Sequence, residues 1–342
     1  MLERIKQKII ESKLQLSILG ILIIVFTIFI IGNPKTFLSY NIYYAFMSTI
    51  PFAAILALSV TLVVILGEID LSFPSVVGFC AWVFAALFNK TNNIYLAFVC
   101  SLAVGMFAGF INSVFIVRIG IPSLIVTIGM MYLWRGLIMI VCGGLGLSLV
   151  KTQGTVLYKV LVGRIGGVVP AQAIWALVIA IILGLILNRH RYGAHLLYAG
   201  DDAVSARMMG VNVERVKTIA FVQLGVCAAF VGVLATLEVL YFWPSTGEGY
   251  LMKSLASVFI GGTSVFGGMG TIFGTFIGAI IMGSMEAGIV STGISGFWTQ
   301  FIYGLVIVLS LTIYAYMNKR MRLSEKLIRS IKSLFKKIKK IR

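Results

Sequence analysis

Charged residues are scarce in this chain of 342 residues. Asp, Glu, Lys and Arg make up 11% of it, whereas hydrophobic residues make up 60%. A soluble globular domain has about 25% charged and about 45–50% apolar residues. The composition therefore excludes a water-soluble enzyme, a disordered chain and a fibrous repeat. It predicts an all-α, polytopic membrane protein.

Groups that could carry chemistry are also few. The two histidines, His190 and His195, both lie in a polar segment, so none is available within the membrane for a proton relay or a metal site. The four cysteines lie in apolar runs without metal-ligand spacing. Neither a G-x-x-x-x-G-K-[ST] phosphate loop nor a G-x-S-x-G elbow occurs. We therefore expect no catalytic residue and no metal or cofactor bound by this chain.

Acidic residues are outnumbered, with 11 Asp and Glu against 28 Lys and Arg, which gives a net charge of +17. Such an excess can indicate nucleic-acid binding. In so apolar a chain, however, an anionic lipid surface is the better partner, and we expect no nucleic acid.

What the sequence does contain is a series of apolar runs. A helix needs about 20 apolar residues to cross the hydrocarbon core of a bilayer. One run, 254–266, is short and ends in glycines; counting it gives about ten membrane helices. The predicted spans are 14–31, 42–66, 74–88, 94–117, 122–142, 171–187, 217–238, 254–266, 271–290 and 297–316.

The distribution of Lys and Arg predicts the orientation. With the N-terminus inside, the cytoplasmic side holds four basic residues in 1–13, one at Arg118, five in 188–217 and eleven in 318–342. External segments hold only six. Because cytoplasmic loops carry the excess of basic residues, both termini are predicted to be cytoplasmic. The first span lacks a small-residue cleavage pattern, which favours a retained signal anchor over a cleaved signal peptide.

Three regions follow from this pattern. Residues 1–13 form a basic cytoplasmic N-terminus, and residues 14–317 form a single transmembrane domain. Residues 318–342 form a basic tail in which apolar residues recur every three or four positions. This spacing predicts an amphipathic helix on the inner leaflet, with a specific partner contact as the alternative.

Two interruptions stand out within the apolar runs. Residues 67–75 contain Glu68, Asp70, a Pro and a Gly. One interpretation is a helix break whose polar groups bind a ligand. The other is a turn in which Asp70 or Ser72 caps the next helix. Residues 261–270 are too rich in glycine for a plain helix. Both breaks fall on the predicted cytoplasmic side.

Polar residues inside spans are candidates for a pathway, because a charge within a bilayer normally faces a cavity or a partner. Arg135 and Glu286 lie at similar predicted depths, so we expect them to pair or to line the outer vestibule; the alternative for Glu238 and Glu286 is that they reach the external interface. The candidate pathway residues are Glu68, Asp70, Asn112, Thr127, Arg135, Gly262, Thr263, Glu286 and Gln300.

The polar loop 188–217 contains Gly200-Asp201-Asp202-Ala203 and ends a short helical pattern at Gly210. Asp201 or Asp202 can cap a short helix that Gly210 ends. Such a helix suits docking to a soluble partner, although an ordinary loop between spans is equally compatible with the residues.

At this loop the sequence resembles the permeases of monosaccharide ABC importers, of the ribose, xylose and galactose type. Tyr192-Gly193 followed by 206–217 resembles their coupling region. Three further segments, 69–72, 122–136 and 260–274, resemble their I-D-L-S, P-x-F-I-V-T-L-G…R-G and I-G-G-T-S-x-x-G-G-x-G motifs in the same order.

The resemblance implies a type II-importer-like permease with about ten helices in a bacterial inner membrane. It also implies a second permease subunit, a cytoplasmic ATPase that holds ATP and Mg²⁺, and an extracytoplasmic binding protein that delivers the solute. The coupling residues that it implies are Gly193, Asp201, Asp202, Ala203, Arg207 and Gly210.

Several positions depart from the family pattern. Glu68 stands where relatives have Gly, Lys253 stands in place of a carboxylate in their G-Y-E-L-D-A-I-A segment, and Glu286 replaces a common Asn. A sugar is therefore one candidate solute, and a polyol or another small polar molecule is another. The function expected is ATP-driven alternating access; the alternative is a self-sufficient secondary transporter or channel.

Overall fold

The computed structural model describes residues 2–291, 295–309 and 312, which are predominantly helical. Within these ranges eight helices are long and apolar enough to cross a membrane, and shorter apolar helices cover Tyr250–Ile260 and Trp298–Leu309. The predicted polytopic all-α fold is confirmed, and eight of the ten predicted spans are helices long enough to cross a membrane. The end of the predicted span 297–316 and the basic tail 318–342 lie outside the described residues.

The long helices correspond closely to the predicted apolar runs. Those that meet the length and hydropathy of a membrane span are α1 (Leu2–Gly32), α3 (Tyr40–Ile65), α4 (Phe73–Thr91), α5 (Ile94–Ser113, continued by a π-helical turn, Val114–Arg118), α6 (Ser123–Cys142), α8 (Ala171–Arg189), α11 (Val213–Val239) and α13 (Ile272–Ser291). The shorter helices with labels are α2 (Pro34–Phe37), α7 (Val156–Val162), α9 (Arg191–Asp201), α10 (Ala203–Met208) and α12 (Tyr250–Ile260).

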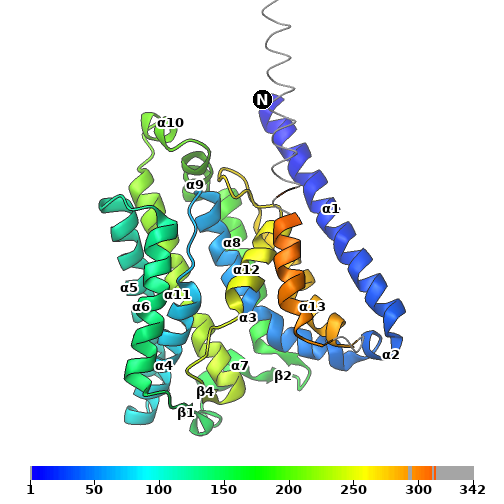
Figure 1. Cartoon of the computed structure of the whole chain (residues 1–342), viewed down its shortest axis with the longest axis vertical. Coiled ribbons are helices and arrows are strands. Elements are labelled where there is room, and N and C mark those ends of the chain that lie inside the picture. Colours follow the sequence, from blue (N-terminus) through cyan, green and yellow to red (C-terminus); the bar gives the residue numbers. More distant parts are fainter. Residues whose placement is uncertain (1, 292–294, 310–311, 313–342) are drawn as a thin grey trace, which may run out of the picture.

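Helix α3 lies at the centre of the bundle and α1 at its edge. Of the most apolar stretch of each helix, 94% is buried in α3 but only 6% in α1. Figure 1 shows α1 running obliquely along the outside, beyond α13. A helix that is apolar on all sides can be either buried in protein or exposed to lipid, and only the packing distinguishes the two.

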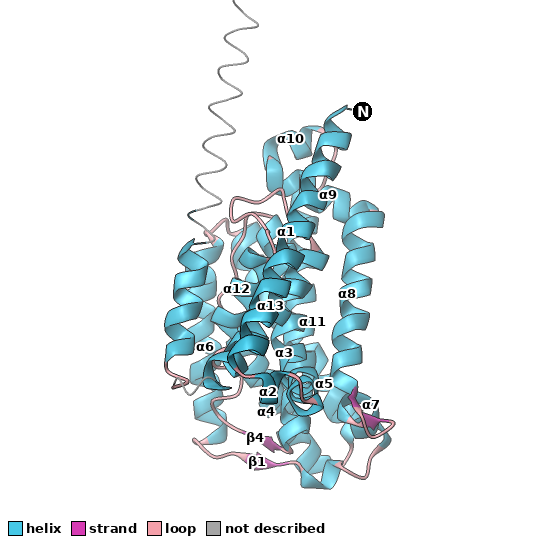
Figure 2. Ribbon diagram, turned by 90° about the vertical axis from the view of Figure 1, so that its right-hand side faces the viewer, coloured by secondary structure: helices cyan, strands magenta, loops and turns pink. Residues whose placement is uncertain are grey.

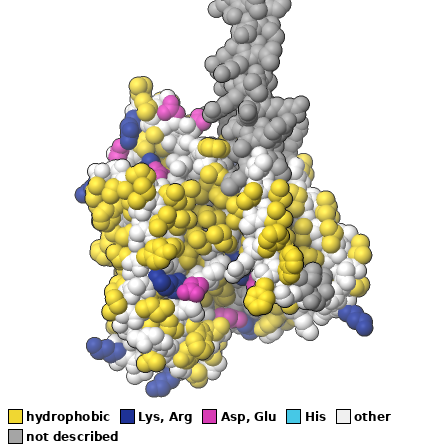
Figure 3. Space-filling model, in the orientation of Figure 1, with side chains coloured by type: hydrophobic (Ala, Val, Ile, Leu, Met, Phe, Trp, Pro, Cys, Tyr) yellow, Lys and Arg dark blue, Asp and Glu magenta, His cyan; other side chains and the backbone are white. Residues whose placement is uncertain are grey.

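The two ends of the bundle carry different secondary-structure elements. Figures 1 and 2 show α9 and α10 at one end and the short strands with α7 at the other. There β1 (Leu147–Ser148) pairs with β4 (Tyr241–Phe242), and β2 (Arg164–Ile165) pairs with β3 (Val169–Pro170). Between the ends, Figure 3 shows a mostly apolar surface, as a lipid-embedded bundle requires.

Both predicted helix breaks are present. Helix α3 ends at Ile65 and α4 begins at Phe73, while α12 ends at Ile260 and α13 begins at Ile272. The span expected at 254–266 is instead the 11-residue helix α12, which ends where the glycines begin. At 1.5 Å per residue, α12 is only about 16 Å long, which is too short to cross a bilayer.

Candidate functional site: a polar loop against two helix breaks

Helix α10 has a well-defined cap at each end. The Oδ1 atom of Asp202 accepts the N–H groups of Val204 at 2.9 Å and Ser205 at 3.3 Å, and its Oδ2 accepts the Ser205 hydroxyl at 2.6 Å. Gly210 follows the helix with a φ of +82°, a conformation that favours glycine. The predicted capped helix is confirmed. Asp202 is the cap, and Asp201 is the last residue of α9.

These hydrogen bonds also set the protonation of the cap. The side chain and backbone of Ser205, followed by the backbone of Val204, lower the pKa of Asp202 from its ordinary 3.8. A lowered pKa means that the folded state binds the proton less tightly than the unfolded state. The cap therefore stabilises the fold above pH 3.8 and is lost as the pH falls through the lowered pKa.

The surface of α10 beyond the cap is apolar. Val204, Met208 and Met209 are 59%, 84% and 64% exposed. Arg207 lies beside them and pairs with Glu214 at 2.6 Å on the next helix. Exposed apolar side chains with a polar rim are typical of a protein-binding surface. We call Val204, Met208 and Met209 the tip of α10.

On its other side the loop rests on both helix breaks. A Cβ atom at Gly200 of α9 would lie 1.8 Å from the carbonyl oxygen of Ile65, and one at Gly267 would lie 2.5 Å from the carbonyl oxygen of Gly200. The Ile65 oxygen accepts a hydrogen bond from the Gly268 N–H at 2.8 Å. Only glycine allows three backbones to approach so closely. We call Ile65, Gly67, Gly200, Gly267 and Gly268 the backbone junction.

A second contact ties the first break to α11. The carboxylate of Glu68 forms a hydrogen-bonded ion pair with Lys217, and both side chains are largely buried, with 14% and 23% exposure. Glu68 therefore faces the start of α11 and not an open pathway. Glu68, which stands where relatives have Gly, therefore has an ion-pair partner in Lys217, which lies outside the I-D-L-S motif.

Asp70 also has a structural role. It is 2% exposed, and its Oδ1 accepts the Ser72 N–H at 2.6 Å and the Ser72 hydroxyl at 2.7 Å. The Nδ2 of Asn112 donates to Asp70 Oδ2 at 3.0 Å and to Ser72 Oγ at 2.8 Å. Of the two readings of this segment, the structure supports the turn, because Asp70 binds the backbone just before α4.

Helix α6 supports the same break from the other side. Ser123 Oγ accepts the N–H of Ile69 at 3.2 Å. Thr127, which is fully buried, donates to the carbonyl oxygens of Ser123 at 2.8 Å and Ile69 at 3.3 Å. Thr127 therefore holds the break in place and is not exposed to a pathway in this conformation.

The glycine-rich break is held differently. Gly262 has a φ of +80°, and the neighbouring Thr263 is 3% exposed. Within the described residues, the Thr263 Oγ1 has no hydrogen-bond partner. Behind the break, Cβ atoms at Gly274 and Gly278 would lie 2.1 Å and 2.3 Å from the backbone oxygens of Gly261 and Ser257, respectively. The small residues of α13 thus allow the close helix packing that their spacing predicts.

The expected pairing of Arg135 with Glu286 is wrong. Arg135 Nη1 donates to the carbonyl oxygens of Pro244 at 2.9 Å and Thr246 at 3.2 Å, and it lies 3.7 Å from Glu248 Oε1. Glu286 instead pairs with Lys253. The linker between β4 and α12 supplies nearer partners for Arg135, and α12 itself supplies the partner of Glu286.

Lys253 and Glu286 are two of the three positions that depart from the family pattern. They form an ion pair in which the ammonium of α12 is balanced by the carboxylate of α13. Glu238 pairs with Arg164 of β2 at 2.5 Å. Gln300 is exposed.

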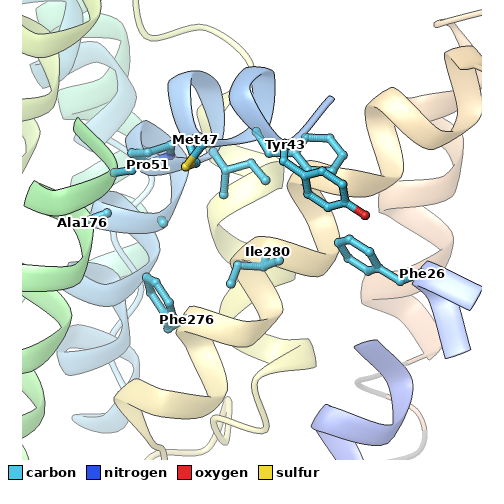
Figure 4. A pocket seen from close by; sticks show the side chains of 11 residues that line it. Phe26, Tyr43, Met47, Pro51, Ala176, Phe276 and Ile280 are labelled. Carbon is cyan, nitrogen blue, oxygen red and sulfur yellow. The ribbon is translucent and has the colours of Figure 1, made fainter. Parts of the chain in front are cut away.

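A cavity of about 400 Å³ lies elsewhere, between α1, α3, α8 and α13. Figure 4 shows aromatic and aliphatic side chains around it. It is therefore unsuited to a polar solute. Its lining residues are Phe26, Tyr43, Phe46, Met47, Ile50, Pro51, Ala54, Ala173, Ala176, Phe276 and Ile280.

Residues 42–311 match the family described as the permease component of the branched-chain amino acid transport system. The match covers most of the chain. The chain belongs to this permease family. It is the transmembrane permease of an ABC importer, as its sequence motifs predict.

Relatives of this permease carry the name autoinducer 2 import system permease protein LsrC. The protein from Klebsiella pneumoniae is 30% identical over 296 residues, which cover 86% of the permease and 84% of the relative. The protein from Yersinia enterocolitica is 30% identical over 260 residues, which cover 74% of the permease and 69% of the relative. The similarity thus extends over most of both chains.

Sequence reasoning missed several residues of this site. Lys217 and Lys253 were counted only as charges that set orientation, and Glu248 was not considered. Gly200 was read as part of a polar loop. No periodicity marks these residues, because each acquires its role from a partner more than 30 positions away or from a backbone that passes beside it.

Proposed function

We propose that α9 and α10 of this permease dock on a cytoplasmic ABC ATPase. The observation that carries the proposal is the capped helix α10, which exposes an apolar tip on one side and connects through Gly200 to both helix breaks on the other. ATP and Mg²⁺ would bind to the partner ATPase and not to this chain.

The orientation that we propose places α9, α10 and both termini in the bacterial cytoplasm. The excess of Lys and Arg in loop 188–217 and in both terminal regions supports it. Figure 1 is compatible with this arrangement, since the start of α1 lies at the same end of the bundle as α10. The strands β1 to β4 then face outward, where an extracytoplasmic binding protein would deliver the solute.

A second permease subunit, identical or related, would complete the pathway. The side chain of Glu248, which pairs with Arg135 of the membrane helix α6, is 60% exposed, and such a carboxylate requires a covering other than lipid. A solute pathway shared with a second subunit would meet that requirement. This support is independent of the coupling surface.

The proposed solute is a sugar or another small polar molecule. The names of the relatives refer to import of autoinducer 2, which makes a small polar signal one candidate among these. The mechanism we propose is alternating access, in which closure of the ATPase pair displaces α10. The backbone junction would pass this displacement to α4 and α13 together, because its three segments are in contact.

Co-purification tests the docking surface. Met208→Asp places a charge at the most exposed position of the tip, whereas Met208→Leu keeps its size and apolarity. We expect the aspartate variant to reach the membrane normally but to lose the ATPase during purification of the assembled importer, and the leucine variant to retain it. Equal recovery of the ATPase with both variants would contradict the assignment of α10.

A transport measurement addresses the alternative function. We expect the chain alone in liposomes to move no solute down a gradient, because uptake would require ATP and the partner ATPase. Gradient-driven uptake by this chain alone would favour a self-sufficient transporter.

A further inference from the structure

We propose that two ion pairs around the start of α12, Arg135–Glu248 and Lys253–Glu286, form a water-filled, charge-balanced entrance to the pathway. Such an entrance admits polar solutes without net charge and favours neither anions nor cations. This inference rests on the proposed function for the identity of the pathway, but its test does not depend on the ATPase.

The first pair is fixed by backbone contacts. Arg135 is held by the carbonyl oxygens of Pro244 and Thr246, so its guanidinium stays beside the linker that leads into α12. Glu248 lies 3.7 Å away. The arginine side chain is 19% exposed and the glutamate side chain 60% exposed, so the pair opens toward the surface.

The second pair begins five residues further along the chain. Lys253, in the first turn of α12, pairs with Glu286 of α13, and their side chains are 28% and 45% exposed. The two pairs therefore flank the same helix start. One lies toward α6 and the other toward α13.

Each pair includes one residue of a helix long enough to span the membrane, Arg135 in α6 and Glu286 in α13, near the helix end that faces outward in the proposed orientation. Arg135 precedes the end of α6 at Cys142 by seven residues, and Glu286 precedes the end of α13 at Ser291 by five. At 1.5 Å per residue these positions are about 10 Å and about 8 Å below the helix ends. Figure 3 shows acidic and basic side chains adjoining one another within the lower half of the apolar face.

Exposed charges at this depth require water. A charge in hydrocarbon costs at least about 2.5–3.5 kcal/mol, so carboxylates with about half of their surface free would be unfavourable against lipid. The linker itself is closely packed, since a Cβ at Gly247 would lie 2.1 Å from the carbonyl oxygen of Pro74 in α4. The charged groups therefore line a fixed wall and do not belong to a mobile loop.

The kind of solute that the entrance admits follows from its balance of positive and negative charge. Arg135 and Lys253 are donors, and Glu248 and Glu286 are acceptors, so the entrance offers both kinds of hydrogen bond within a short distance. A hydroxyl group both donates and accepts, and it can bind to either member of a pair. A solute with net charge gains no overall attraction, because each cation is matched by an anion.

Thiol labelling in intact cells tests the proposal. Ser245→Cys places a near-isosteric reporter in the linker, where residue 245 is exposed and its carbonyl oxygen accepts the N–H of Glu248 at 3.0 Å. The probes are the anionic sulfonatoethyl and the cationic trimethylammonioethyl methanethiosulfonates, with rates expressed relative to a free thiol. The unsubstituted chain provides the background, and Leu133→Cys, exposed on another face of α6, is the control at matched depth.

We expect Ser245→Cys to react with both reagents at relative rates within about threefold of each other, and Leu133→Cys to react roughly a hundredfold more slowly because lipid excludes charged reagents. Adding Glu248→Gln leaves Arg135 unbalanced and should raise the anionic-to-cationic ratio about tenfold. Adding Glu286→Gln should shift the ratio in the same direction through Lys253.

Two results would overturn the proposal. Labelling of residue 245 no faster than that of residue 133 would exclude a water-filled entrance, and an unchanged ratio in both glutamine variants would exclude the charge-balanced filter. Labelling occurs without ATP hydrolysis. Normal labelling with no ATP-dependent import would therefore contradict only the proposed function, and import with no labelling would contradict only this inference.

Discussion

Replacing Gly200 by alanine perturbs the backbone junction with a single methyl group. A Cβ at this position would lie 1.8 Å from the carbonyl oxygen of Ile65 and 2.8 Å from the N–H nitrogen of Gly268. A carbon–oxygen contact needs about 3.3–3.6 Å, so α9 and the first break must separate by roughly 1.5 Å. That shift opens the junction without removing any side chain.

The free-energy cost of Gly200→Ala has two parts that can be estimated. Overpacking a tight contact typically costs about 1–3 kcal/mol. If the separation also breaks the 2.8 Å hydrogen bond between Gly268 and Ile65, the buried groups left unpaired add about 1–3 kcal/mol. Alanine favours the helical conformation of α9 by only about 1 kcal/mol relative to glycine. The net effect is a loss of roughly 1–5 kcal/mol at the junction.

The assay is the amount of solute imported per ATP hydrolysed by the importer assembled with its own ATPase, together with the Tm of the purified complex. We expect Gly200→Ala to retain ATP hydrolysis but to lower the transport ratio severalfold or more. Gly129→Ala in α6 is the matched control, because a Cβ there meets nothing within 4 Å. Indistinguishable transport ratios and Tm values for the two variants would refute the reasoning.

Three further predictions concern the supports of this site. Asp202→Ala should destabilise α10 and lower solute-stimulated ATP hydrolysis, whereas Asp202→Ser should retain most of that hydrolysis because serine also caps helices. Lys217→Glu should reduce transport, because the new carboxylate repels Glu68. The double reversal, Lys217→Glu with Glu68→Lys, should recover at least half of the lost transport. No recovery would mean that loss of the ion pair is not the cause of the reduced transport. Asn112→Ala should lower the free energy of unfolding by about 1–3 kcal/mol, since Asp70 loses a buried donor, and an unchanged Tm would contradict that role.

Much of the fold follows from composition and length of apolar runs. A run such as 42–66 can exist in a membrane only as a helix, because lipid offers no partners to backbone N–H and C=O groups. The short helix α12 was less well predicted, since its end depends on where the glycines turn and its beginning on how the linker enters the bundle.

Single residues were predicted less well than segments. Asp70 and Asn112 were recognised as polar groups within apolar surroundings, but their mutual hydrogen bond joins positions 42 residues apart. Arg135 and Glu286 were paired wrongly, because a similar position along a helix says nothing about which face a side chain occupies or what lies beside it.

The sequence by itself determined that the chain spans a membrane, where its helices begin and break, and where a capped helix would interrupt the apolar pattern. These features depend on local properties, namely hydrophobicity, glycine content and side-chain caps. Only the tertiary structure decided that α9 rests on both breaks and that Lys253 balances Glu286. Such contacts join segments far apart in the chain, and their geometry arises only when the helices pack.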